Sequence, residues 1–532
     1  MPTKKIIAHS WDLLAVRPSD VARNRDAWAE IPVDGVTLAL VRTNAQGVVL
    51  SFGSIMTDPT WERSFWRSEI EPLRQCASRT LRHNFLTSFW APKKRLAWSD
   101  DAAWRQCATN LNTLAWLAKE GEAKGILIDP EDYPGTRQFF LHAEDGTFDE
   151  GAAWARKRGA QMMRSMAEAF PSIHVLSFWL LSMTPSYLEG MPDDVALRVR
   201  AAGDLWPAFV NGLLDALPPE ARLIDGNEHG YLYEASRNDF YYSAWKIQNR
   251  GLMLVEPENR RVYQTQVLTG FGLYLDMYTN PKGTATYYFG EVNGSRVNHF
   301  ERNVMQAVEA SSEYVWLYGE KFDWIVWQGT SRTLAQWQDK LHPRMNDVLR
   351  LATHPAAAAR EILQRQHASG TAHSNRLANA AFQAPPDRDG ALPLSWASWQ
   401  MERTRQGVFQ RAHDDAAAPF IRASGVENGC LIAQARVQPG ELLAISGEGK
   451  GRSMHLMARW QAKGVWTSET LDVHIPFQPS TRETDWRSAQ GLVRVPEGVD
   501  AVVYLWCVRQ QANEVSALRN PAIYSVFGGM NE

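Results

Sequence analysis

The chain has 532 residues, of which 45% are hydrophobic and 22% are charged, and its formal net charge is −3. This length is too great for one ordinary domain, and the composition is typical of a folded protein rather than a disordered one. The charge gives no bulk attraction to nucleic acid or to an anionic membrane, and no apolar run is long enough to span a bilayer. We therefore expect two or three domains, with neither nucleic acid nor a membrane as a partner.

The cysteine and histidine content predicts no metal and no cofactor. Four cysteines in so long a chain do not form a disulfide framework, and no Cys/His spacing is typical of zinc. Lys4 and Lys5 are not followed by a long apolar segment, so no signal peptide is predicted. The localisation stays open: either the protein remains in the cell, or it is secreted or periplasmic and has lost a signal peptide.

From the N-terminus to about residue 350, short apolar segments alternate with longer segments of helical periodicity. This alternation predicts a parallel sheet with helices outside it. The expected helices include Asp101–Glu120, Gly151–Ala169, Val195–Ala216 and Val297–Ser311. The expected strands are Lys5–Leu13, Gly35–Arg42, Leu81–Trp90, Gly125–Asp129, His174–Leu181, Arg222–Asn227, Gly270–Tyr278 and Tyr314–Gly319. Eight strands predict a (β/α)8 barrel of the TIM type over residues 1–353. An open doubly wound sheet is disfavoured, because no Gly-x-Gly-x-x-Gly turn follows the first strand.

The predicted pattern of secondary structure changes after residue 353. Residues 354–378 are first helical and then linker-like, and short alternating strands separated by turn residues follow over residues 379–532. Regularly spaced strands of this kind predict an all-β sandwich. We expect strands at Gly407–Gln410, Cys430–Val437, Leu442–Gly447, His455–Gln461, Gly491–Val495, Ala501–Gln510 and Ala522–Phe527.

The most informative segment runs from Gly125 to Tyr133. A fully apolar strand stops at Asp129, and Glu131 and Tyr133 follow at once. Active sites of α/β barrels lie at the carboxyl ends of the strands, and a charged group at the mouth of a core costs free energy unless it is paired or used. We therefore predict that these acids face a pocket.

Acids and aromatic residues recur at the carboxyl ends of the other predicted strands, which predicts one shared cleft. The residues that we expect to bind substrate there are His9, Trp11, Asp12, Trp90, Asp129, Tyr133, Trp179, Asp225, His229, Asp276, Tyr278, Glu320 and Trp324. The chain also contains 22 tryptophans. Most of these belong to the core, but a tryptophan face also suits the apolar C–H surface of a sugar ring.

Hydrolysis of a glycosidic bond requires two acids in one cleft, and aromatic residues there can bind the sugar ring. One carboxyl group protonates the leaving oxygen, and the other is a nucleophile or a base for water. Two acids in a partly dry cleft also separate each other's pKa values. We predict Glu131 and Glu228 as the catalytic pair, with Asp129 and Asp225 in support; Glu131 with Glu320 is the second choice.

The barrel region resembles uncharacterised bacterial glycoside-hydrolase-like barrels. The resemblance rests on Trp11-Asp12, residues 32–36, Asp129-Pro130-Glu131-Asp132-Tyr133, Asp225-Gly226-Asn227-Glu228 and residues 316–321. The largest clan of retaining barrel glycosidases carries Asn-Glu after strand four and a Glu after strand seven. This chain departs from that pattern with Pro130-Glu131 and Asp276, so the roles of the acids, and retention or inversion, stay open.

The C-terminal region resembles the jelly-roll sandwich of many polysaccharide enzymes, which implies a carbohydrate-binding-module-like domain. The resemblance begins at Asn379 and includes residues 396–399, 437–440, 495–499 and 520–524. Trp460, Trp466 and Trp486 are candidates for a sugar platform. A sandwich that only buttresses the barrel is the alternative.

Each candidate acid also has a structural explanation. Asp129 can brace its loop, Asp225 can form a turn, and His9 can be an ordinary core histidine.

The leading hypothesis is a glycoside hydrolase with an oligo- or polysaccharide substrate. The alternative is a non-catalytic carbohydrate-binding or scaffold protein, since binding alone does not need paired acids. A metal-dependent hydrolase using Asp129, His9 or His229 ranks low, because no paired-histidine ligand spacing is present.

Overall fold

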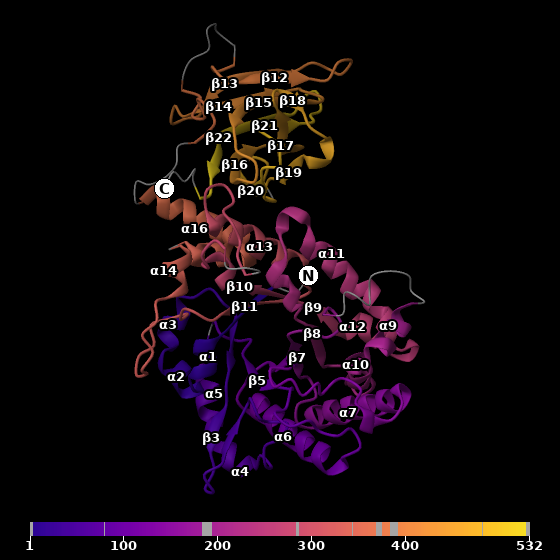
Figure 1. Cartoon of the computed structure of the whole chain (residues 1–532). Helices are drawn as coiled ribbons and strands as arrows, with labels where there is room; N and C mark the ends of the chain where they lie inside the picture. The colour runs from indigo at the N-terminus through magenta and orange to yellow at the C-terminus, as the bar shows by residue number, and fades with distance from the viewer. Residues whose placement is uncertain are drawn as a thin grey trace. The chain divides into compact units, whose positions relative to one another are not determined.

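The computed structural model describes residues 4–78, 80–183, 194–283, 287–342, 344–368, 375–383, 392–480 and 482–527. The chain divides into two compact units, which we call unit 1 (Met1–Thr353) and unit 2 (His354–Glu532). Figure 1 shows mixed helices and strands in unit 1, and mainly strands in unit 2. Among the described residues, no helix combines the length and apolar character that a bilayer crossing requires.

Unit 1 is built around one parallel sheet of nine strands, in the order β10-β11-β1-β2-β5-β6-β7-β8-β9. Only Gly270 separates β9 from β10, so the chain itself joins the two ends of this order and the barrel is nearly closed. The strands are β1 (Lys5–Ser10), β2 (Gly35–Leu38), β5 (Phe85–Phe89), β6 (Gly125–Asp129), β7 (His174–Ser177), β8 (Arg222–Asp225), β9 (Val267–Thr269), β10 (Phe271–Tyr274) and β11 (Tyr314–Gly319). The α/β class is confirmed, but the sheet has nine strands where eight were expected.

Helices lie between these strands in the chain, with a separate antiparallel pair, β3 (Val41–Thr43) and β4 (Val49–Ser51). The longest two begin at capped positions. Asp100 accepts hydrogen bonds from two backbone N–H groups of α6, and Thr147 forms a capping box with Glu150 at the start of α7. The helices of unit 1 are α1 (Trp11–Ala15), α2 (Pro18–Arg23), α3 (Arg25–Ala29), α4 (Arg63–Trp66), α5 (Ile70–Cys76), α6 (Asp101–Glu120), α7 (Phe148–Ala169), α9 (Asp194–Ala202), α10 (Trp206–Asp215), α11 (Asp239–Trp245), α12 (Arg260–Gln266), α13 (Arg296–Ala310), α14 (Trp337–Leu341) and α15 (Met345–Thr353).

Two predicted elements are divided in the structure. The helix expected over Val195–Ala216 is α9 and α10, because Gly203 has a positive φ of 66° and Pro207 suits the first turn of a new helix. The strand expected over Gly270–Tyr278 ends at Tyr274, and Leu275–Tyr278 forms the short 3₁₀ helix η8. The second division matters for the site, because it changes where Asp276 and Tyr278 lie.

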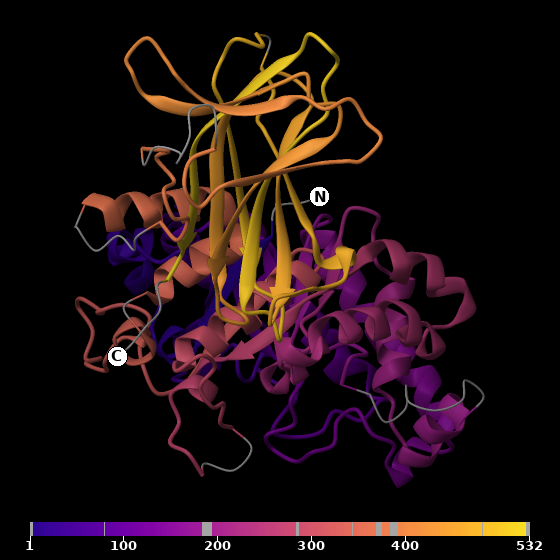
Figure 2. The same cartoon turned by 90° about the horizontal axis from the view of Figure 1, so that it is seen from above.

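In the residues that the structure describes, unit 2 has one α-helix, α16 (Pro355–Ala368), one 3₁₀ helix, η9 (Glu469–Leu471), and two antiparallel sheets. One has the order β12-β15-β21-β17-β18, with β19 also paired to β17; the other has the order β13-β14-β22-β16-β20. Figure 2 shows their long strands running alongside one another. The strands are β12 (Ala397–Gln400), β13 (Val408–His413), β14 (Pro419–Ser424), β15 (Gly429–Arg436), β16 (Leu442–Lys450), β17 (Met454–Ala462), β18 (Val465–Trp466), β19 (Val473–Pro476), β20 (Arg487–Arg494), β21 (Ala501–Val508) and β22 (Val515–Ser525).

The two sheets of unit 2 share one hydrophobic core. Alternate residues of β17, including Leu456, Ala458 and Trp460, are buried in it, and Ile445 and Leu518 enter from the other sheet. The side chains between them along β17 therefore face outward. This arrangement agrees with the β-sandwich expected for the region.

Candidate active site in unit 1

A pocket of about 1400 Å³ lies at the carboxyl ends of the strands of unit 1. Its lining includes His9 at the end of β1, Phe89 at the end of β5, and Tyr274 at the end of β10. The predicted site residues that it brings together are His9, Trp11, Asp129, Glu131, Tyr133, Glu228, His229 and Glu320. Residues from six or more strand ends therefore converge on one cavity.

Three carboxyl groups interact within this pocket. Asp129 is buried at the end of β6, and its Oδ1 accepts the backbone N–H of Glu131 at 2.8 Å. Burial raises the pKa of Asp129 to about 8, and the charge of Glu131 raises it further against the hydrogen bonds that lower it. Burial also raises the pKa of Glu228 to about 8, with added contributions from the charges of Glu131 and Asp129. The segment after β8 thus holds a carboxyl group, that of Glu228, which is mostly protonated at neutral pH.

The backbone around Glu228 is held by a dense set of hydrogen bonds. The N–H of Glu228 donates to the carbonyl of Phe178 at 3.0 Å, and the indole N–H of Trp316 donates to the carbonyl of Gly226 at 2.8 Å. Asn227, between them, has a left-handed conformation with φ of 39°. This bend starts the 3₁₀ helix η3 (Glu228–Leu232) and places Glu228 at the pocket.

Asp225 organises this bend without lining the pocket itself. It is fully buried, and its carboxylate accepts the backbone N–H groups of Leu181 at 2.9 Å, Ser182 at 3.0 Å and Asn227 at 3.2 Å, together with the Ser182 hydroxyl. Burial raises its pKa. Asp225 therefore joins the segment after β7 to the segment that carries Glu228.

Aromatic rings form a continuous wall of the pocket. Tyr318 stacks on His9 at 5.5 Å, on Tyr274 at 5.3 Å and on Tyr231 at 6.0 Å between ring centroids. Phe178 packs against His9 at 5.3 Å. Phe178, Tyr231, Tyr274 and Tyr318 were not among the predicted site residues, although Phe178, Tyr274 and Tyr318 lie at a strand end or directly after one and Tyr231 lies in η3, which follows β8.

Hydrogen bonds link the aromatic wall to Glu320. The indole N–H of Trp11 donates to the Tyr318 hydroxyl at 2.6 Å, and that hydroxyl donates to Glu320 Oε1 at 3.0 Å. The backbone N–H of Glu320 donates to Asp276 Oδ2 at 2.9 Å. Glu320 is thus already partnered inside the pocket through both its side chain and its backbone.

His9 is a neutral part of this wall. It is almost fully buried, and its Nδ1 lies 2.8 Å from the Thr37 hydroxyl. Burial lowers its pKa to about 3, so the imidazole carries no charge near neutral pH.

Several predicted substrate-binding residues lie outside the pocket lining. Asp12 is fully buried and accepts the Trp324 backbone N–H at 2.9 Å and the Trp327 indole N–H at 3.0 Å. Asp276 is also buried and holds the Glu320 backbone. These acids, like Asp225, satisfy loop donors that would otherwise be unpaired, which corrects their predicted contact with substrate.

The aromatic predictions are corrected in a similar way. Trp90, Tyr278 and Trp324 are at most 3% exposed and pack in the core. The indole N–H of Trp90 donates to Ser88 at 3.1 Å, and the Tyr278 hydroxyl accepts from Asn303 at 2.9 Å. Trp179 is half-buried and is not part of the pocket lining. Trp90 and Trp324 therefore belong to the core, and Trp11 is the one predicted tryptophan that lines the pocket.

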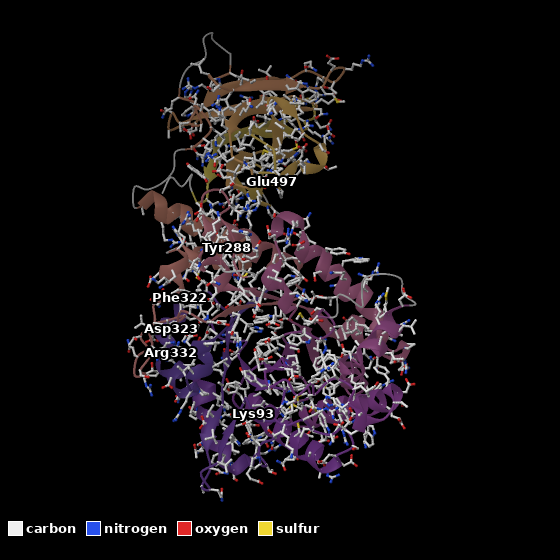
Figure 3. The ribbon with its side chains drawn as sticks, viewed as in Figure 1. Lys93, Tyr288, Phe322, Asp323, Arg332 and Glu497 are labelled. Atoms are coloured by element: carbon white, nitrogen blue, oxygen red, sulfur yellow. The ribbon has the colours of Figure 1, made fainter. Side chains whose placement is uncertain are left out.

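The pocket rim also carries cations. The Arg332 guanidinium forms an ion pair with Asp323 at 2.5 Å, and Figure 3 labels the two residues next to each other. Lys321 donates to the Asn280 side chain. Lys93, which Figure 3 also labels, is exposed. Over the described ranges, no cluster of three or more His, Cys, Asp or Glu side chains is arranged to hold a metal ion.

The three tryptophans proposed as a sugar platform in unit 2 do not lie together. Trp460 is 1% exposed in the core, with its indole N–H on the Leu471 carbonyl at 2.7 Å. Trp486 directly precedes β20 of the five-stranded sheet and packs against Phe420, whereas Trp466 is in β18 of the other sheet. A common platform of these three residues is therefore wrong.

No family model and no curated protein matches the chain. Parts of it are similar to solved structures. One is the enzymatically active domain of tailspike protein 4 of Bacteriophage CBA120, with a TM-score of 0.24, 12% identity, and coverage of 28% of this chain and 21% of that one. Another is a CBM4 chain, with a TM-score of 0.22, 14% identity, and coverage of 28% and 98%. A third is the MgGH51 α-L-arabinofuranosidase, with a TM-score of 0.22, 14% identity, and coverage of 29% and 27%. TM-scores this low carry no argument about function.

The raised pKa of Glu228 predicts a pH-dependent effect on stability. Its pKa is about 8 in the folded chain and about 4.3 in an unfolded one. The folded state therefore binds more protons between these values, and the stability that this protonated group contributes is lost progressively as the pH rises from about 4.3 to about 8. We expect Glu228→Gln, which stays neutral, to melt several degrees above the wild type at pH 9 and close to it at pH 4. Differential scanning calorimetry at both pH values measures this, with the exposed Glu62→Gln as control. Equal shifts at the two pH values would contradict the assigned pKa.

Proposed function

We propose that unit 1 is a glycoside hydrolase that cleaves a glycosidic bond of an oligo- or polysaccharide. The observation that carries the proposal is that Glu131 and Glu228 line one pocket and that the charge of Glu131 helps to raise the pKa of Glu228. This is the electrostatic relation that separates a general acid from an anionic partner. The aromatic wall supplies apolar surface for sugar rings.

In the proposed reaction, Glu228 is the general acid. Its carboxyl proton moves to the glycosidic oxygen as the bond from that oxygen to the anomeric carbon breaks. Glu131, as a carboxylate on the loop after β6, either attacks the anomeric carbon or takes a proton from an attacking water molecule. Asp129 is a positioning residue, since it accepts the Glu131 backbone N–H.

We also propose that β9 and β10 are the two halves of one strand bent at Gly270. If β9 and β10 are counted as one strand, that strand pairs with β8 through β9 and with β11 through β10, and the barrel has eight strands. For unit 2 we propose a jelly roll, on the basis of its two antiparallel sheets with a shared core.

The test of this proposal is the release of sugar by the full-length protein. We expect new reducing ends from at least one member of a panel of plant, bacterial and algal glycans. Because Glu228 must be protonated, kcat/KM should fall as the pH rises through about 8. Binding of a glycan without release of any sugar would instead favour a non-catalytic carbohydrate-binding protein.

A further inference from the structure

The outer face of the six-stranded sheet of unit 2 carries a second cavity, a groove of about 890 Å³. The β17 side chains that line it, His455, Met457 and Arg459, alternate with the residues buried in the core. The groove is therefore built on the side of the sheet that faces away from the other sheet. Its volume is within the range of sites that hold small ligands.

The register of the strands builds the floor of this groove. One row across four neighbouring strands consists of Trp399, Cys430, Cys507 and His455. The next row, two residues along, consists of Ile432, Leu505, Met457 and His474. Each row thus has an apolar or thiol centre and ends at a histidine, and the two histidine rings lie 5.0 Å apart.

Half-exposed tryptophans stand at two edges of the groove. Trp399 is 51% exposed on β12, and Trp466 is 49% exposed on β18. Trp466 is held in place by Arg459, whose guanidinium lies 4.9 Å from the ring centroid. Arg459 is itself fixed by ion pairs of 3.1 Å to Glu469 and to Asp472. The tryptophan therefore presents a supported aromatic face rather than a freely rotating one.

The charged side chains that line the groove are two arginines, Arg459 and Arg509, and none of the lining residues is acidic. Arg509 is exposed, and in the part of the chain that the structure describes no carboxylate forms an ion pair with it. The charge of Arg459 is offset by its two acidic partners, so Arg509 is the cation that is left for a ligand.

We propose that this groove binds an acidic oligosaccharide. The tryptophans would pack against the apolar faces of the sugar rings, and the apolar floor of the groove would contact the C–H groups of those rings. Arg509 would form an ion pair with a carboxylate or sulfate group of the ligand. The proposal goes beyond the proposed hydrolysis, because it assigns a ligand to unit 2 and does not depend on Glu131 or Glu228. Binding, rather than sugar release, is therefore the measurement that tests it.

Isothermal titration of the full-length protein with matched glycan pairs provides the test. The pairs are polygalacturonate with its fully methyl-esterified form, and dextran sulfate with dextran, so that the two members of each pair share one sugar backbone and only one member is anionic. Tighter binding of at least one acidic member is expected, and the pair that responds distinguishes carboxylate from sulfate. Arg509→Gln should weaken that binding about tenfold, and Trp399→Ala or Trp466→Ala should weaken it several-fold to tenfold.

Control variants separate the groove from general effects. Arg422→Gln removes an exposed arginine on β14, in the other sheet, and Trp486→Ala removes an aromatic ring from that region. Both should bind as the wild type does, and melting temperatures confirm that each variant is folded. Equal binding of the charged and neutral glycans, or equal weakening by Arg422→Gln and Arg509→Gln, would overturn the proposal. Because the same titrations do not measure turnover, an inactive barrel would leave their outcome unchanged.

Discussion

Glu131→Gln should lower the turnover of a glycan substrate by about 10³-fold, with little change in melting temperature. The substitution keeps the size of the side chain, but an amide neither attacks the anomeric carbon nor removes a proton from water. Glu131 is half-buried in the pocket, and its backbone N–H is bound by Asp129, so the loop should keep its conformation. Steady-state kinetics on a substrate identified by sugar release measure the effect.

The leaving group of the substrate separates the roles of the two acids. Glu228→Gln should strongly slow the cleavage of a natural glycan, whose leaving oxygen needs a proton, but should only weakly slow the cleavage of a nitrophenyl glycoside. Glu131→Gln should slow both substrates. If Glu228→Gln slows both equally, Glu228 is not the general acid.

Two further variants complete this experiment. Glu320→Gln tests the second-choice pair, and we expect a smaller loss of turnover, because Glu320 is already bound by Tyr318. Glu62→Gln changes an exposed glutamate of unit 1 in the same way and should leave the kinetics unchanged. A loss for Glu320→Gln as large as that for Glu131→Gln, with Glu228→Gln unaffected, would transfer the acid role to Glu320.

The sequence predicted the strands that are most strongly determined by local composition. Gly125–Asp129 and Tyr314–Gly319 begin and end as expected, and so does the helix Asp101–Glu120. Continuous apolar runs and a capping aspartate mark these elements. The bounds expected for Gly270–Tyr278 were wrong, because Asp276 pairs with the Glu320 backbone, a contact between residues 44 positions apart.

The candidate site was predictable in part. The sequence placed Glu131 and Glu228 at the ends of strands that lie in one sheet, and the structure brings both to the same pocket. It did not show that Asp12 would turn away to bind donors more than 300 residues later in the chain. It also did not identify Tyr274 and Tyr318 as pocket residues, since a buried parallel strand has no polar alternation to show which side chains face a cavity.

The most damaging substitution that we expect outside the pocket is Asp225→Ala. It would leave the backbone N–H groups of Leu181, Ser182 and Asn227 buried without their acceptor. Each unpaired donor costs about 1–3 kcal/mol, so the free energy of unfolding should fall by at least about 3 kcal/mol. Turnover should also fall, because Asp225 holds the backbone of Asn227, and the left-handed bend at Asn227 orients the segment that carries Glu228.

Asp100→Ala is the matched control, since Asp100 also accepts two backbone N–H groups of unit 1 but does so at an exposed helix start. That loss should cost about 1 kcal/mol and leave kcat unchanged. Hydrogen exchange measured by mass spectrometry locates the effect. In Asp225→Ala, peptides covering residues 177–183 and 225–232 should exchange faster than in either the wild type or Asp100→Ala. Faster exchange spread evenly over unit 1 would instead mean that Asp225 contributes to global stability and does not specifically stabilise the segment that carries Glu228.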